Sequence, residues 1–367
     1  MWQEELKKNI CTIEQLKKHI TLTPKEERQL KRVTEYHPMS VTRYFMSLID
    51  PNDPQDPLRK MIIPSVDELD LSGSYDPSGE LDNTVLPGLQ HKYSPTALIL
   101  TTNRCASYCR YCFRKRLIGL PTEEIIKKFD EAAKYIGEHT EINNVLLSGG
   151  DPLTLRTQMI EGFLRKLVKI PHLSFIRFGS KTPILAPDRI IEDDDLLSLL
   201  QHYSRPKHKI YINTQFNHPR ELTDKSMRAI NKLIRRSIIV NNQTVLLKGV
   251  NDDPDVMAKL MNQLTGIGVI PYYIFQCRPV KRVKRSFQVP ITRGLEIIRE
   301  TKRKCNGCSK RFHYVMSHRT GKVEIIGVNG NEIYFKYHEA RDSRNNSRFF
   351  KRRVNETAGW LDEFPAV

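Results

Sequence analysis

The sequence predicts an α/β fold: a partial, open (β/α)6 barrel, preceded by an N-terminal helical extension and followed by a C-terminal segment. From residue 97 onward, short apolar runs alternate with longer amphipathic stretches about six times. This alternation implies parallel strands joined by right-handed crossovers. Six such units are too few to close an eight-stranded barrel, so we expect the sheet to stay open.

The elements are expected in a simple order along the chain. Residues 1–45 alternate charged and apolar residues at helical spacing, with a helix start at Thr23-Pro24, and the Pro-, Asp- and Gly-rich stretch 50–90 predicts irregular wrapping chain. We divide the chain into an N-terminal region (1–95), a barrel core (96–304) and a C-terminal segment (305–367). The strand–helix pairs are expected at 97–101 and 122–138, 145–147 and 156–168, 175–178 and 192–202, 210–213 and 223–236, 238–246 and 254–265, and 272–275 and 291–303.

The composition is typical of a globular protein. Of the 367 residues, 39% are hydrophobic and 28% charged, no run of 18 apolar residues occurs, and the N-terminus is polar, so we expect neither a membrane span nor a signal peptide. Seven cysteines, three of them clustered, fit a reducing cytoplasm better than a disulfide framework. We therefore expect a cytoplasmic protein. The sequence leaves its oligomeric state open, and a homo-oligomer is one of the alternatives.

The formal charge of +17 has two interpretations. Basic residues are concentrated at 278–285 and 341–353, and such runs can bind nucleic acid. Aromatic residues that could stack on bases are not regularly interleaved with them, however. An enzyme that handles anionic cofactors is the simpler interpretation, so nucleic acid is not the expected partner.

Three cysteines on one short stretch carry the strongest chemical signal. Cys105, Cys109 and Cys112 have the spacing C-x3-C-x2-C directly after the first expected strand. A [4Fe–4S] cluster normally takes four thiolates, so three leave one iron open to a small molecule. Radical S-adenosylmethionine enzymes use this arrangement to bind S-adenosylmethionine, whose cleavage by an electron from a cellular reductant yields a 5′-deoxyadenosyl radical. Zinc is the alternative, but zinc sites usually space their paired cysteines as C-x2-4-C and need a fourth ligand.

Polar motifs follow the other expected strands as well. In barrels of this kind the chemistry lies at the carboxyl ends of the strands. One Gly-Gly pair usually just makes a turn, but polar clusters after strand upon strand indicate a shared site. The clusters are Ser148-Gly149-Gly150-Asp151, residues 179–183, residues 213–219, Asn242-Gln243-Thr244 and Gln276-Cys277-Arg278.

Together with the cysteine loop, several segments resemble the lysine 2,3-aminomutase family of radical S-adenosylmethionine enzymes. The resemblance spans roughly residues 40–328. It implies an isomerase that shifts an amino group with the help of pyridoxal phosphate and so interconverts an α-amino acid and its β-isomer. The segments that carry it are Tyr44–Pro51, Leu146–Asp151, Asn217–Pro219, Leu247–Asp252 and Pro271–Cys277.

The resemblance also implies a role for individual residues. Lys322, behind a single glycine where the family has a glycine-rich approach, is the lysine that binds pyridoxal phosphate; an exposed residue at a strand end is the other interpretation. Arg114 pairs with the substrate carboxylate, for which a guanidinium is geometrically suited. The remaining contacts are Gly149, Gly150, Asp151, Gln215 and Gln243 with S-adenosylmethionine, and Lys92 and Tyr93 with pyridoxal phosphate.

Two departures from the family pattern concern the substrate. Lysine-using members have an aspartate after the Gln-Cys dipeptide and another before the pyridoxal lysine, where this chain has Arg278 and Ser317. An arginine at contact distance repels the ε-ammonium group of lysine. A family branch that acts on glutamate has a basic residue at the position of Arg278. We therefore expect Arg278 to bind an acidic or neutral amino acid rather than lysine.

Other departures leave alternatives open. The zinc site of some members would begin at Asp253; Cys305 and Cys308 form one C-x2-C pair, for which Cys277 is a candidate third ligand. Unpaired thiols are the preferred interpretation, and zinc is not expected. Thr96 replaces a second basic residue near the expected phosphate. The rival hypotheses are a radical S-adenosylmethionine enzyme without pyridoxal phosphate, acting on another small or peptide substrate, and a basic nucleic-acid-binding protein with a structural iron–sulfur cluster.

Overall fold

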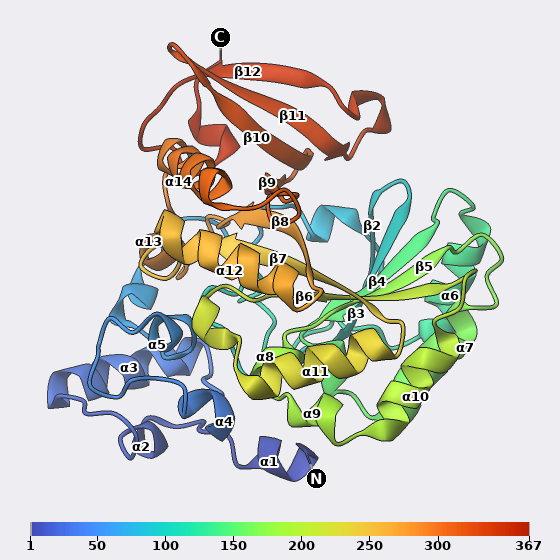
Figure 1. Cartoon of the computed structure of the whole chain (residues 1–367), viewed down its shortest axis with the longest axis horizontal. Helices are drawn as coiled ribbons and strands as arrows, with labels where there is room; N and C mark the ends of the chain where they lie inside the picture. Colours follow the sequence, from blue (N-terminus) through green and yellow to red (C-terminus); the bar gives the residue numbers. More distant parts are fainter. Residues whose placement is uncertain (1, 367) are drawn as a thin grey trace.

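One sheet organises the molecule, and its twelve strands lie in the same order in space as in the sequence. The structure is a computed structural model that describes residues 2–366 (Figure 1). The strands are β1 (Thr84–Leu86), β2 (Leu89–Tyr93), β3 (Thr96–Thr102), β4 (Asn144–Gly149), β5 (Phe175–Gly179), β6 (Lys209–Thr214), β7 (Ile239–Leu246), β8 (Ile270–Gln276), β9 (His313–His318), β10 (Gly321–Asn329), β11 (Glu332–Ala340) and β12 (Phe349–Arg353).

The central strands form an open barrel. Strands β3 to β9 run parallel to one another, whereas β1 and β2 at one edge and β10 to β12 at the other are antiparallel to their neighbours. Because β1 and β12 each pair on one side only, the sheet does not close. The predicted partial, open barrel is confirmed.

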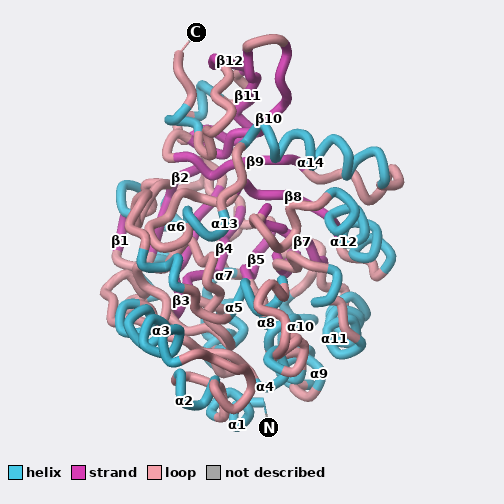
Figure 2. The backbone as a smooth tube through the Cα atoms, turned by 90° about the vertical axis from the view of Figure 1, so that its left-hand side faces the viewer, coloured by secondary structure: helices cyan, strands magenta, loops and turns pink. Residues whose placement is uncertain are grey.

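Helices cover the outer face of the parallel strands, as Figure 2 shows from the side. Each helix is amphipathic; on α7, Ile160, Leu164 and Leu167 recur at helical spacing and are fully buried. All six expected strand–helix pairs are present, although the first helix begins at Phe129 rather than near 122. The crossover helices are α6 (Phe129–Glu138), α7 (Thr157–Leu167), α10 (Asp194–Tyr203), α11 (Asp224–Arg235), α12 (Pro254–Gly266) and α14 (Ile291–Lys304).

A seventh parallel strand, β9, extends the barrel beyond the six expected units. It follows α14 and pairs with β8 in parallel register, with His313 next to Tyr273. The run His-Tyr-Val-Met-Ser-His has only three apolar residues between polar ends. It therefore carries little of the apolar signal by which a buried strand is found in a sequence.

The N-terminal region packs beneath the barrel (Figure 1). A capping box at Thr23 begins its longest helix: the Thr23 hydroxyl accepts from the Glu26 amide and the Glu26 carboxylate accepts from the Thr23 amide. The stretch 50–90 is more ordered than expected, since it contains a helix, two 3-10 turns, β1 and the first two residues of β2. The helices are α1 (Trp2–Lys7), α2 (Ile13–Leu16), α3 (Pro24–Tyr36), α4 (Arg43–Met46) and α5 (Pro57–Ile62), and the turns are Val66–Leu69 and Leu81–Asn83.

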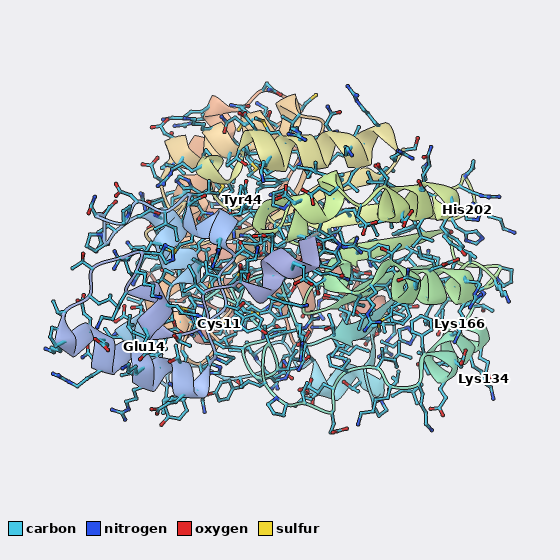
Figure 3. All side chains as sticks on the ribbon, turned by 90° about the horizontal axis from the view of Figure 1, so that it is seen from below. Cys11, Glu14, Tyr44, Lys134, Lys166 and His202 are labelled. Atoms are coloured by element: carbon cyan, nitrogen blue, oxygen red, sulfur yellow. The ribbon has the colours of Figure 1, made fainter. Side chains whose placement is uncertain are left out.

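Figure 3, a view from below, shows the N-terminal region apart from the outer helices. Cys11 and Glu14 lie among the N-terminal helices, while Lys134, Lys166 and His202 lie on α6, α7 and α10. Three short helices remain, α8 (Thr182–Leu185), α9 (Asp188–Ile191) and α13 (Lys284–Phe287), together with 3-10 turns at Pro152–Thr154, Pro219–Glu221, Ser343–Asn345 and Leu361–Glu363. Over residues 2–366, none of these helices has both the length and the apolar character that crossing a bilayer requires.

Candidate active site

A cavity of about 340 Å³ lies among the carboxyl ends of the parallel strands. Loops after β3, β4, β5 and β6 line one part of it, and residues of β2, β8, β9 and β10 line another. The cavity brings together every residue that the sequence analysis assigned to the site: Cys105, Cys109, Cys112, Arg114, Gly149, Gly150, Asp151, Gln215, Gln243, Lys92, Tyr93, Arg278 and Lys322.

The three cysteines lie on the loop between β3 and α6. Burial raises the pKa of Cys105, Cys109 and Cys112, that of Cys112 to about 11, and repulsion from neighbouring thiols adds to the shift of Cys105 and Cys112. Such thiols keep their protons until a metal cation replaces them. Across the described residues the three sulfurs do not gather within 4.8 Å of one another, so they are more widely spaced than the ligands of a single zinc ion. This donor set fits a cluster.

A buried carboxylate holds the cysteine loop against the N-terminal region. Arg110 donates to both oxygens of Glu68, at 2.8 Å from Nε and 2.6 Å from Nη2, and Lys115 bonds the same carboxylate. Although burial opposes ionisation, the two cations lower the pKa of Glu68 to about 2. Backbone bonds add to the attachment, since the amide of Arg110 donates to the Met61 carbonyl at 2.8 Å. The loop is therefore fixed from outside the barrel.

Arg114 has a partner within the chain. Its Nη2 lies 2.8 Å from Glu80, and its Nη1 donates to Ser148 Oγ at 2.9 Å and to the Gly149 carbonyl at 3.2 Å. Arg116 bonds the other oxygen of Glu80 at 2.9 Å, and the two arginines lower the pKa of Glu80 to about 2 despite its burial. The assignment of Arg114 to the substrate carboxylate stays a prediction, but most of its donors are already occupied.

Tyr111, between the second and third cysteines, links their loop to the next strands. Its hydroxyl donates to Gln215 Oε1 at 3.1 Å and accepts from Asn217 Nδ2 at 2.7 Å and Lys181 Nζ at 2.9 Å. Gln215 is thereby held at the cavity wall after β6, and Gln243 of β7 lies in the same wall. Amide side chains at this position can bind the polar groups of a small ligand.

The Gly149-Gly150 pair lets the cysteine loop pass against the end of β4. A Cβ on Gly149, whose φ is +108°, would lie 2.4 Å from the Thr102 carbonyl oxygen, and one on Gly150 would lie 2.2 Å from that of Arg104. Asp151 instead makes hydrogen bonds within the chain: its buried carboxylate accepts from Ser180 Oγ at 2.7 Å and from the Lys181 amide at 2.8 Å. The glycines form a surface that a ligand can approach closely.

Lys322 lies at the start of β10 and points into the cavity. Its Nζ is 3.2 Å from Glu339 and lies over the rings of Tyr93 and Tyr273, 5.3 and 4.9 Å from their centroids. Burial lowers its pKa, and Glu339 opposes that shift. Gly321 has a φ of +154°, and a Cβ there would lie 2.6 Å from the Glu339 carbonyl oxygen. A single glycine therefore suffices to bring Lys322 alongside β11.

Further cations share the Lys322 part of the cavity. Lys92 donates to the carbonyls of Ser78 at 3.0 Å and His318 at 2.5 Å, and burial, with Arg278 nearby, lowers its pKa to about 7. Arg177 of β5 bonds Asn144, but its buried Nε has no hydrogen-bond partner among the described residues. Burial lowers the pKa of Arg177. This surplus of buried cations fits an anionic group such as a phosphate.

Like Lys92 and Arg177, Arg278 has no carboxylate partner among the described residues, and its side chain makes no hydrogen bond there. Its guanidinium carbon lies 3.8 Å from the centroid of the Phe113 ring, and within residues 2–366 no carboxylate oxygen comes within 4.0 Å of its nitrogens. Burial lowers its pKa, whereas Glu80 at longer range raises it. Ser317 lines the cavity directly opposite Lys322 in the β9–β10 register. Neither position offers an anion to a substrate side chain.

Sequence reasoning missed three charged residues of the cavity. Arg177 interrupts the apolar run Phe175–Phe178, and a charge inside an expected buried strand is a signal that could have found it. Glu80 and Glu339 offered no such signal, because their partners Arg114 and Lys322 lie 34 and 17 positions away. Their pairing becomes visible only in the fold.

The fold does not bring the cysteines considered for zinc together as a ligand set within residues 2–366. Cys277 and Cys305 are buried and Cys308 is exposed, and over the described chain no three such ligands that include them lie within 4.8 Å of one another. Asp253 caps α12, accepting from the amides of Asp255 and Val256.

Comparison with known proteins agrees with this geometry. The Radical SAM superfamily pattern matches residues 99–261. Two Aquifex aeolicus proteins named putative L-lysine 2,3-aminomutase are similar: one is 41% identical over 95% of this chain and 93% of its own length, the other 43% identical over 91% of both. The glutamate 2,3-aminomutase of Clostridioides difficile is 40% identical over 81% of this chain and 69% of its own length. A solved radical SAM methyltransferase from Sphaerobacter thermophilus covers 62% of this chain and 68% of its own at 15% identity, with a TM-score of 0.34, and adds no weight.

These matches first define the class: the chain is a radical S-adenosylmethionine enzyme. More narrowly, it belongs to the lysine 2,3-aminomutase family, whose members are isomerases that move an amino group between neighbouring carbon atoms. Membership in this family implies a [4Fe–4S] cluster, S-adenosylmethionine and pyridoxal phosphate as cofactors.

Proposed function

We propose that this enzyme interconverts an α-amino acid and its β-isomer, and that the substrate side chain is acidic or neutral. One observation carries the proposal: a single cavity contains three cysteines, a buried lysine and an arginine that has no carboxylate partner among residues 2–366. The first two features fit the cofactors of the family, and the third distinguishes the substrate. A lysine side chain would bring a second cation to Arg278, whereas a carboxylate or another acceptor would pair with it.

The roles of the residues follow from their positions. Cys105, Cys109 and Cys112 would hold the cluster, and Gly149 and Gly150 would let S-adenosylmethionine approach the backbone. When bound, the cluster and S-adenosylmethionine would supply a 5′-deoxyadenosyl radical, and pyridoxal phosphate would supply a ring that can delocalise an unpaired electron. A cellular reductant would provide the electron.

The Lys322 part of the cavity would bind the pyridoxal cofactor. Lys322 would hold it covalently, with Tyr93 and Tyr273 beside the lysine. Lys92 and Arg177 would neutralise the phosphate; Arg177 supplies a cation that Thr96 does not. Asp151 would orient the loops around S-adenosylmethionine rather than contact it, because its oxygens already accept from Ser180 and Lys181.

The cluster assignment is tested by Cys109→Ala in anaerobically reconstituted enzyme. Without the second thiolate the cluster lacks one of its three ligands, so formation of 5′-deoxyadenosine from S-adenosylmethionine should fall to background. Cys308→Ala, at an exposed cysteine outside the cavity, is the matched control and should leave it unchanged. Product formation by Cys109→Ala at the wild-type rate would contradict the assignment.

The lysine assignment is tested by borohydride reduction followed by peptide mapping. A lysine joined to pyridoxal phosphate through a reducible bond should be labelled at Lys322 and nowhere else. Lys92, also buried in the cavity, is the internal control, because it should contact the phosphate without being labelled. No label on protein saturated with the cofactor, together with intact cleavage of S-adenosylmethionine, would favour the rival enzyme that works without pyridoxal phosphate.

A further inference from the structure

Three potential metal ligands lie together beside the cavity, on β9, β10 and β11. They are His313, Glu324 and His338, and one ligand atom from each lies within 4.8 Å of those of the other two. Over residues 2–366, this is the one such group of three. None of the three belongs to the cofactor and substrate contacts described above.

The strand register places all three side chains on one face of the sheet. Glu324 pairs with Val315 on β9 and with Lys336 on β11. His313 lies two residues from Val315 and His338 two residues from Lys336, and residues two apart on a strand share a face. Three neighbouring strands therefore each contribute one ligand.

A β-bulge aims His338 and Glu339 toward the same face. Lys322 pairs with Glu339 and Val323 with Tyr337, which leaves His338 as the additional residue on β11. Without the bulge, consecutive residues would point to opposite faces. The same bulge thus places Glu339 beside Lys322 and adds His338 to the group formed by His313 and Glu324.

The existing contacts orient the ligands. His313 Nδ1 lies 2.7 Å from Glu324 Oε1, and His338 Nε2 lies 2.6 Å from the Tyr273 hydroxyl. The bond to Tyr273 leaves the other ring nitrogen of His338 available and fixes the orientation of its ring, as is usual around metal-bound histidines, whereas the His313–Glu324 contact joins two of the ligands directly. Tetrahedral bonds of about 2.1 Å separate two ligand atoms by about 3.4 Å, so only small side-chain shifts are needed to bind an ion.

We propose that His313, Glu324 and His338 bind a divalent transition-metal ion. Two imidazoles and one carboxylate suit Zn²⁺, Co²⁺ or Ni²⁺, whereas Mg²⁺ and Ca²⁺ prefer oxygen ligands. The ion would join β9, β10 and β11 two residues from Lys322 and one from Glu339. It would therefore stabilise the strands that present the Lys322–Glu339 pair. The site is separate from the cysteines considered for zinc.

The competing explanation is a hydrogen-bonded His–Glu pair beside an unrelated histidine. It predicts no metal requirement and no difference between metals. The side chain of His313 is 43% exposed and that of Glu324 21%, so an added ion can reach the group from solvent. The two explanations are therefore separable by metal binding to the folded, full-length chain.

Equilibrium dialysis of the reconstituted enzyme against buffered Zn²⁺ tests the proposal. The wild type should bind one equivalent more than His338→Gln and Glu324→Gln; the second variant can still form a hydrogen bond to His313. His202→Gln, at a histidine on α10 that belongs to none of these contacts, should bind as the wild type does. Equal stoichiometry in all four proteins would overturn the proposal.

Thermal unfolding provides a readout that does not depend on activity. Saturating Zn²⁺ should raise the Tm of the wild type and of His202→Gln, because a ligand that binds only the folded state stabilises it. It should not raise the Tm of His338→Gln or Glu324→Gln, and Mg²⁺ should raise none of the four. A Zn²⁺-dependent rise of equal size in wild type and variants would contradict the site even if the variants fold less stably.

Discussion

The two parts of the cavity differ in how their buried charges are balanced. Around the cysteine loop, Glu68 and Glu80 accept bonds from four cations, so the chain supplies its own counter-charges. In the other part, within the described chain, Glu339 is the one carboxylate within 4.0 Å of Lys322, and no carboxylate lies within 4.0 Å of Arg278.

This difference distinguishes the buried charges that stabilise the fold from those that are available to bind a ligand. Leaving a buried charge unpaired is costly, so a chain that balances some charges and not others indicates where an external partner belongs. The balanced part holds the loop that presents the thiols. The part around Lys322 and Arg278, where cations outnumber carboxylates, is suited to bind anions: a phosphate, and a substrate group opposite Arg278.

The largest expected effect comes from breaking the balanced part. Glu68→Gln removes the counter-charge of Arg110 and Lys115 and should lower the free energy of unfolding by about 3–5 kcal/mol. Because the folded pKa of Glu68 is about 2, below its ordinary 4.5, its contribution is present above pH 4.5 and is lost as the pH falls toward 2. Urea unfolding at several pH values measures this.

Glu131→Gln, at an exposed partner of Lys128, is the control and should change stability by less than about 0.5 kcal/mol. A Glu68→Gln protein as stable as this control would show that the buried pair does not fix the loop.

A smaller effect is expected at the unbalanced part. Arg278→Asp reverses the charge opposite the substrate side chain and should cost about 2–5 kcal/mol in transition-state binding for the true substrate. Preference should move toward lysine. Competition assays with glutamate, neutral amino acids and lysine measure both changes through kcat/KM.

Arg285→Asp is a matched control from the same basic run, since its side chain is 64% exposed. It should leave selectivity unchanged. Wild-type enzyme that converts lysine faster than glutamate and other acidic or neutral amino acids would contradict the argument from Arg278.

The smallest effect concerns Lys92. With a pKa of about 7, it is charged below neutral pH and loses its proton as the pH rises, so affinity for pyridoxal phosphate should weaken above pH 7. Lys92→Met should bind the cofactor about tenfold more weakly at pH 6.5, a loss of about 1.4 kcal/mol, and should show a flatter pH profile. Fluorescence titration from pH 6.5 to 8.5 tests this.

Lys127→Met, at an exposed lysine on the segment before α6, should retain the wild-type profile. Parallel profiles for wild type and Lys92→Met would show that Lys92 does not contact the phosphate.

Local patterns predicted the barrel but not its charge network. The strand–helix alternation and the Thr23 cap were readable because periodicity and capping act over a few residues. The cysteine spacing predicted a donor set for the same reason. The pairing of Glu80 with Arg114, the unpartnered Nε of Arg177 and the bulge at His338 depend on strands meeting in space, so no short window of sequence contains them.

The attachment of the cysteine loop to the N-terminal region has a consequence for the order of assembly. Asn9 donates to the Ala106 carbonyl at 2.7 Å across 97 residues, and the amide of Tyr108 donates to the Ser40 carbonyl at 2.9 Å. Contacts of such long range form slowly, because the entropy of closing a long loop opposes them. During synthesis, the N-terminal residues that hold the cysteine loop therefore leave the ribosome before the thiols do, and the loop reaches its final position only when these distant segments have joined.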